Sequence, residues 1–188
     1  MGITKENLPV KLIISLISAR SELISKVIGE LVYHYGKIDF ISELLNFDHT
    51  KYYNKEMGND LKRKILSFEK LIDPGILPEI KNFTNNLEKK YLNKANSRII
   101  NIDPGYLDFH HLILATTKSY AHRPYLRMGI YADLTLIFKA KTFHPLDWTY
   151  PDYSSEPLLE IMKIIRKKHL FQIRGAHKFE VMGKTVPC

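Results

Sequence analysis

The sequence of 188 residues has little cysteine and no long hydrophobic run. Its one cysteine, Cys188, is the last residue, so no disulfide can form within the chain. No apolar stretch approaches the ~18 residues that cross a bilayer. No secretory signal opens the chain, because Lys5 and Glu6 precede a short segment that Pro9 interrupts. These absences predict a cytoplasmic protein with no membrane partner.

Several motifs that carry chemistry are also absent. Gly183-Lys184-Thr185 resembles the end of a phosphate-binding P-loop, but the first glycine of that motif would fall on Lys178. The chain has no Asn-Lys-x-Asp guanine motif, no His-Glu-x-x-His and no Gly-x-Ser-x-Gly. His110 and His111 would face opposite sides of a strand and cannot clasp one ion there. We therefore predict no P-loop, no structural zinc site and no metal site built from side chains.

The net charge of +8 is unevenly distributed, since 28 Lys and Arg oppose 20 Asp and Glu. Residues 51–100 carry a net +5 and residues 161–188 a net +6, whereas residues 101–160 carry −2. If the consecutive cations of 62–64 and 166–168 lie on helices, they point around the axis and form no stripe. This favours solvated helix surfaces, and an RNA-binding surface on the basic helices remains the alternative.

Hydrophobic spacing in the first fifty residues predicts a strand, a helix and a second strand. The apolar run 11–18 is typical of a strand buried on both faces. Ser18 or Ser21 can cap the next helix, and Gly36 can end it. Residues 38–47 then alternate as a second strand.

The middle of the chain contains the tripeptide Asp-Pro-Gly twice. We predict a helix from about Asp60 to Ile72, which the turn at residues 73–75 ends. Pro78 is well placed to begin another helix. A strand is expected at 98–102, stopped by the second Asp-Pro-Gly at 103–105.

The last part of the chain predicts a hairpin and a helix. Residues 112–117 and 129–139 read as two paired strands, and 157–168 as a helix. Residues 1–168 are therefore expected to form one α+β domain, followed by a tail at 169–188. The predicted sheet is mixed or mostly antiparallel, with helices packed on one face in a ferredoxin-like manner.

Polar and aromatic residues gather in four loops that also carry the most distinctive motifs. The motifs are YYNKEMG (52–58), NIDPGYL (101–107), LATTKSYAHRPYLRMGIYADLTL (114–136) and WTYPDY (148–153). In these and in residues 66–88 the chain resembles a widespread bacterial family of domains of unknown function, over about residues 10–165. Members are sometimes labelled GTP-binding. The resemblance implies a shared site and supplies no reaction.

The loop residues suggest a pocket for a small anionic ligand, phosphate-bearing and nucleotide-like. Arg123 and Lys118 would neutralise the anion. His122 could act as a general acid or base, because the unperturbed pKa of histidine is ~6.5. The remaining candidates are carboxylates that could orient His122, bind a hydroxyl or hold Mg²⁺ through water, and tyrosines that could stack on a base or sugar: Glu56, Asp103, Asp152, Tyr53, Tyr106, Tyr125 and Tyr153.

Each of these assignments has a structural alternative. Asp103 could simply cap its turn, and Arg123 with Asp152 could be an ordinary ion pair. His122 could be a solvated loop histidine. At the level of function, the alternatives are an RNA-associated module that uses the basic helices and tail, and a protein-interaction module that uses the Tyr-rich loops.

Overall fold

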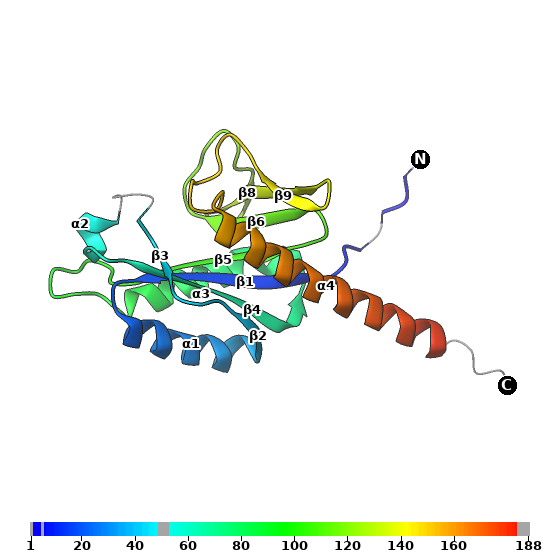
Figure 1. Ribbon diagram of the computed structural model, residues 1–188, viewed down its shortest axis with the longest axis horizontal. Coiled ribbons are helices and arrows are strands. Elements are labelled where there is room, and N and C mark those ends of the chain that lie inside the picture. The colour runs from blue at the N-terminus through cyan, green and yellow to red at the C-terminus, as the bar shows by residue number, and fades with distance from the viewer. Residues whose placement is uncertain (1, 5, 49–52, 184–188) are drawn as a thin grey trace.

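The computed structural model describes residues 2–4, 6–48 and 53–183, and the side chains of these residues except 54, 55 and 176–183. One sheet of nine strands forms the centre of the molecule, with helices on both sides (Figure 1). In chain order the elements are β1 (Val10–Ser18), α1 (Ser21–Tyr35), β2 (Ile38–Ile41), β3 (Leu45–Asn46), α2 (Asn54–Met57), β4 (Lys62–Ile72), the 3₁₀ turn η1 (Pro74–Ile76), α3 (Leu77–Lys89), β5 (Asn101–Leu107), β6 (His111–Thr116), β7 (Tyr125–Arg127), β8 (Ile130–Lys139), β9 (Thr142–Pro145) and α4 (Glu156–Gly183).

The first half of the sheet has ferredoxin-like topology. Strands β2, β4, β1 and β5 lie side by side in that order, and each adjacent pair is antiparallel. With α1 and α3 as connections, this is the split β-α-β-β-α-β arrangement. The predicted α+β class and mostly antiparallel sheet are confirmed, and the ferredoxin-like part is this half.

The second half extends the sheet from β5 through β6, β8 and β7, while β9 pairs with β8. The two faces bury different cores. Even-numbered residues of β1, such as Leu12 and Leu16, pack with α1 and α3, whereas Ile13 packs with Leu158 and Met162 of α4. Thus α1 and α3 share one face as expected, and α4 lies against the other. No helix in the described ranges is both long and apolar enough to cross a membrane.

The predicted helix at residues 60–72 is wrong, because this segment is β4. Leu61, Ile65, Phe68 and Ile72 have helical spacing, but Ile65 and Leu66 are both fully buried. The strand pairs with β1 on one edge and with β2 and β3 on the other. Leu66 packs in the core with α1 and Ile65 in the core with α4, so both faces of the strand are buried. Strands buried on both faces lose their alternation, which leaves sequence periodicity ambiguous.

The second Asp-Pro-Gly does not stop a strand. Strand β5 continues through Asp103, Pro104 and Gly105 and pairs with β1 along its whole length. Its ladder with β6 begins only at Gly105, opposite Leu114. Strands β5 and β6 therefore form a fork that is open before Gly105.

Three other boundaries differ from expectation. The predicted strand 38–47 is two short strands, β2 and β3. Neither Ser18 nor Ser21 caps α1; the Ser18 hydroxyl instead donates to the Ile99 carbonyl (2.7 Å). Helix α4 runs on through Gly183, so the predicted helix end at Lys168, where the tail was expected to begin, lies inside it (Figure 1).

Candidate functional site

A cavity of about 590 Å³ lies at the fork between β5 and β6. Residues of β5 before the fork form one side and the end of β6 forms another. Helix α3, strands β4 and β8, and the loops before β4, before β5, after β6 and before α4 contribute the rest. Five cationic and three acidic side chains line it. The lining residues are Phe47, Tyr53, Arg63, Lys81, Asn85, Arg98, Asn101, Asp103, Leu114, Ala115, Thr116, Thr117, Lys118, Arg123, Asp133, Tyr150, Pro151 and Asp152.

Helix α3 supplies hydrogen bonds to the open edge of β5. The backbone N–H of Ile102 donates to the Glu88 carboxylate (2.6 Å), and the Lys81 ammonium donates to the Ile102 carbonyl (3.2 Å). Backbone groups two residues apart on a strand point to the same edge, so the nitrogen of Pro104 also faces the fork. Proline has no N–H, and this keeps β6 from pairing there.

Lys81 also holds the carboxylate of Asp103, whose oxygens face the cavity. The Lys81 ammonium lies 2.9 Å from Asp103 Oδ1, and the Asn101 amide donates to Asp103 Oδ2. Burial pushes the pKa of Asp103 upward, but the charge and hydrogen bond of Lys81 outweigh it, so that the pKa lies below its ordinary value. Asp103 is therefore a hydrogen-bond acceptor at neutral pH.

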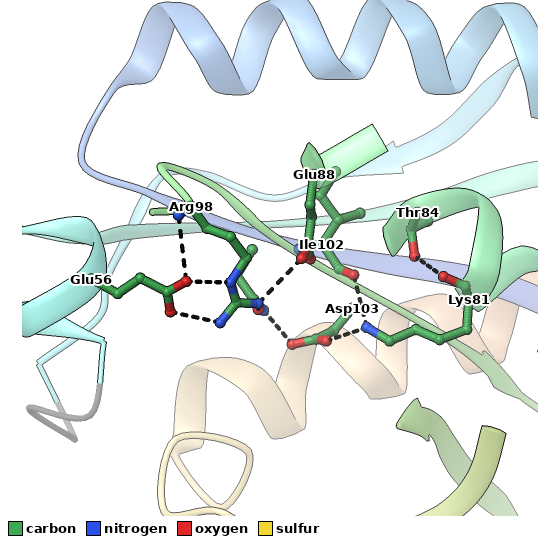
Figure 2. Close-up of polar contacts among 8 residues, drawn as sticks. Glu56, Lys81, Thr84, Glu88, Arg98, Ile102 and Asp103 are labelled. Carbon is green, nitrogen blue, oxygen red and sulfur yellow. Dashed lines mark hydrogen bonds and ion pairs between the residues drawn. The ribbon is translucent and has the colours of Figure 1, made fainter. Parts of the chain in front are cut away.

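Arg98 joins three elements next to this pair (Figure 2). Its guanidinium makes two bonds to Glu56 of α2 (2.7 and 2.8 Å), one to Glu88 of α3 (3.2 Å) and one to Asn101 of β5 (2.9 Å). Hydrogen bonds from Arg98 lower the pKa of Glu56, whereas burial raises the pKa of Glu88. Charge-assisted, bidentate contacts of this kind fix a side chain in one orientation.

Arg63 enters the cavity from β4. Its side chain is 5% exposed, and its guanidinium lies between the rings of Phe47 and Tyr153, 4.8 Å from each centroid. One nitrogen forms an ion pair with Asp152, but Nε has no hydrogen-bond partner among the described residues. Nε is itself enclosed by protein atoms, so Arg63 offers the cavity its charge rather than this donor.

Arg123 completes the cationic lining from the β6–β7 loop. Its Nε donates to Asp133 of β8 (2.8 Å), and another nitrogen donates to the Tyr150 hydroxyl (3.3 Å). Desolvation opposes its charge, but these hydrogen bonds raise the pKa of Arg123 above its ordinary value. The guanidinium is therefore permanently charged.

The structure brings five of the ten predicted site residues to the cavity lining: Tyr53, Asp103, Lys118, Arg123 and Asp152. Two more lie directly behind it, since Glu56 holds Arg98 and Tyr153 stacks on Arg63. His122 is outside the lining; it stacks on Trp148 with its Nε2 3.8 Å from Asp133, too far for a hydrogen bond.

The other two predicted tyrosines lie elsewhere. Tyr106 packs beside Leu77 and Ala115, and the exposed Tyr125 on β7 contacts Tyr131. Burial raises the pKa of Tyr106, as expected for a phenol packed among apolar side chains.

Sequence reasoning missed Arg63, Lys81, Arg98 and Glu88. The helical spacing of residues 60–72 predicts a solvated helix surface at Arg63, whereas the residue lies in β4 with its side chain buried. Lys81 and Glu88, with Thr84 between them, form a buried polar stripe on α3, and that spacing was the signal available. The cavity is consequently richer in cations than the charge of residues 101–160 suggests.

No group of three or more His, Cys, Asp or Glu among the described residues could hold a metal ion.

A family model described as a domain of unknown function (DUF4416) matches residues 8–169, which include every residue of the cavity. The chain belongs to this family. No curated protein and no solved structure matches it. The DUF4416 segment ends within α4, so the last part of this helix extends past the family match.

Proposed function

We propose that the cavity binds a small anionic ligand that carries a phosphate group, as nucleotides do. The observation that carries the proposal is Arg63, a buried guanidinium at the cavity wall whose one ion pair among the described residues is with Asp152. Placing a charge in such a position costs free energy unless a counter-ion is present. Asp152 supplies one counter-charge, and an anion in the cavity would supply a further one.

Two further cations support the same ligand class. Arg123 and Lys118 line the cavity from the β6–β7 region, and guanidinium groups suit the geometry of phosphate oxygens. The volume of about 590 Å³ lies within the usual range for small-molecule sites. The aromatic lining of Phe47, Tyr53 and Tyr150 offers apolar surface to the rest of the ligand.

The RNA-associated alternative has less support. Residues 62–64 lie in β4, and the middle one, Arg63, is directed inward, so these residues form no basic helix face. The protein-interaction alternative has fewer loop tyrosines to form an interface, because Tyr53 and Tyr150 line the cavity and Tyr153 is buried.

The test is binding of phosphate-bearing compounds, measured by calorimetry and by thermal shift, with and without Mg²⁺. We expect a ligand whose affinity falls about tenfold or more in Arg123→Gln and in Lys118→Gln, because each variant removes one charged hydrogen bond. Lys118 is exposed, so its variant should fold even if Arg123→Gln does not.

Arg174→Gln is the matched control, since Arg174 is exposed on α4 and far from the lining residues in the chain. It should bind as the wild type does. A panel of nucleotides and sugar phosphates that never shifts the melting temperature would refute the proposal. Unchanged affinity in both cavity variants would refute it as well.

A further inference from the structure

Exposed aromatic side chains gather beside the cavity, in the β6–β7 loop and in the loop between β9 and α4. Tyr120, Trp148 and Tyr150 are each at least 40% exposed. Two of them meet through His122, whose ring stacks on Trp148 (4.8 Å between centroids) and contacts Tyr120 (5.2 Å). Contiguous apolar surface of this kind is exposed mainly where a partner or ligand binds. These rings are therefore candidates for contact with the ligand.

Arg123 connects the rings to the cavity. Its guanidinium carbon lies 5.9 Å from the centroid of the Tyr120 ring, and one of its nitrogens donates to the Tyr150 hydroxyl (3.3 Å). Arg123 and Tyr150 both line the cavity, and the other three rings are outside its lining. A ligand that places an anionic group near Arg123 consequently has the Tyr150 ring as its neighbour.

Among the aromatic rings of the lining, that of Tyr150 is the most open. Phe47 is buried, and its ring lies against Tyr53 (5.8 Å between centroids) and the guanidinium of Arg63 (4.8 Å). Tyr150 is half-exposed and makes no ring contact with another residue of the described ranges. Its ring can therefore accept a further planar group.

The loop that carries Tyr150 is held against β8 by the two residues before it. The indole N–H of Trp148 donates to the Leu134 carbonyl (2.8 Å), and the Thr149 hydroxyl donates to the Thr135 carbonyl (2.6 Å). A ring on an anchored loop loses little conformational freedom when a ligand packs on it, so the cost of ordering it on binding is small.

We propose that the ligand is a free nucleoside phosphate whose base stacks on the Tyr150 ring, with its phosphate at Arg123. The inference rests on the proposed function and adds the base and its position. Every nucleobase offers a π-face that stacks on an aromatic side chain. The base and the phosphate of a nucleotide are joined by one sugar, which suits a ring and a guanidinium that touch each other. The cavity has the volume of a small-molecule site, which favours a free nucleotide over a nucleic-acid strand.

The experiment measures affinity by calorimetry for adenosine 5′-monophosphate, ribose 5-phosphate and adenosine. The first two share the sugar and the phosphate and differ in the base, whereas adenosine lacks the phosphate. We expect adenosine 5′-monophosphate to bind about tenfold more tightly than ribose 5-phosphate, as stacking of one base allows. It should also bind about tenfold more tightly than adenosine, because adenosine has no charge for the cationic lining.

Two variants of one residue separate the ring from its hydroxyl. Tyr150→Leu removes the ring and Tyr150→Phe keeps it, while both lose the hydroxyl that accepts from Arg123. The affinity ratio of adenosine 5′-monophosphate to ribose 5-phosphate should fall to about twofold in Tyr150→Leu and stay near tenfold in Tyr150→Phe. Tyr33→Leu is the matched control, because Tyr33 lies on α1, is 94% exposed and is outside the lining. Its ratio should equal that of the wild type.

Equal binding of adenosine 5′-monophosphate and ribose 5-phosphate would overturn the base assignment and leave the phosphate site intact. The same ratio in Tyr150→Leu and Tyr150→Phe would overturn stacking on this ring. Adenosine binding as tightly as its monophosphate, or no binding of any probe, would instead refute the proposed function and the inference with it. Tighter binding of a 5′-phosphorylated triadenylate than of adenosine 5′-monophosphate would overturn the assignment to a free nucleotide.

Discussion

The two Asp-Pro-Gly segments have the same sequence and different structures. At residues 73–75 the Asp73 carboxylate accepts the Gly75 N–H (2.6 Å), and Pro74 begins the turn η1. At residues 103–105 the same three residues are extended in β5 and pair with β1. The backbone N–H and C=O groups of a buried segment need hydrogen-bond partners, whether in a turn or in a strand. Asp-Pro-Gly therefore forms a turn only where no neighbouring strand supplies those partners.

The contrast also concerns what each aspartate does. Asp73 serves its own backbone, as an aspartate before a turn usually does. Asp103 instead bonds Lys81 and Asn101 and faces the cavity. Pairing of β5 with β1 therefore frees a turn residue for the candidate site.

The largest difference between the two segments is expected in the unfolding free energy that is lost when the glycine is replaced by alanine. A Cβ at Gly105 would collide with the backbone carbonyl oxygen of Ile113 in β6 and would lie 2.7 Å from the side chain of Leu114. Gly105→Ala should cost about 3 kcal/mol of unfolding free energy, the upper range for overpacking. At Gly75 the nearest atom, 2.8 Å away, is the Asp73 carboxylate, which can rotate.

Urea unfolding checks this prediction, with Gly75→Ala as the matched control and an expected loss below about 1 kcal/mol. Similar losses in both variants would mean that β6 can move away from Gly105. The fork would then be less rigid than its geometry indicates.

A smaller difference in unfolding free energy is expected when the aspartate of each segment is replaced by alanine. Asp103→Ala leaves the nearly buried Lys81 ammonium with only the Ile102 carbonyl among its present partners, which should cost about 2 to 3 kcal/mol. Asp73→Ala removes a turn hydrogen bond and should cost about 1 kcal/mol. The two unfolding free energies, measured side by side, give the comparison; a larger loss at Asp73 would contradict the ion-pair role of Asp103.

The smallest expected effect is a pH dependence that separates Asp103→Asn from the wild type. Because the pKa of Asp103 is lower in the folded state, the folded protein holds fewer protons there than the unfolded chain. This stabilisation is fully present above the ordinary value of 3.8 and is lost as the pH falls through the folded pKa.

Unfolding free energies measured from pH 6 downward should therefore converge for the wild type and Asp103→Asn. The gap should be largest at the upper end of this range. A gap that widens on acidification would mean that the carboxylate is not stabilised in the fold.

Local patterns predicted much of the first and last thirds of the chain. The apolar run of β1, the stop at Gly36 and the pairing of β6 with β8 all follow from residues near in sequence. Strand β4 could not be predicted in this way, because its extended conformation depends on strands that pair with both of its edges. The same limit applied to residues 103–105, whose conformation is set by β1.

The site was predictable where it consists of loop residues. The density of polar and aromatic side chains singled out Tyr53, Asp103, Lys118, Arg123 and Asp152, which the fold gathers at one cavity. Arg63 could not be found this way, since its inward direction follows from the register of β4 against β1, where it lies opposite Ile17. Register sets which face a side chain occupies, and sequence alone did not fix it.

The cavity at the fork between β5 and β6 is lined by residues that differ in how strongly the fold depends on them. Most charged lining residues form an ion pair with an oppositely charged neighbour. Replacing one member of such a pair leaves the other charge without its partner, which destabilises the fold. Asn85 has no such obligation within the described residues. We therefore expect substitutions at position 85 to cost less unfolding free energy than substitutions at the paired charges.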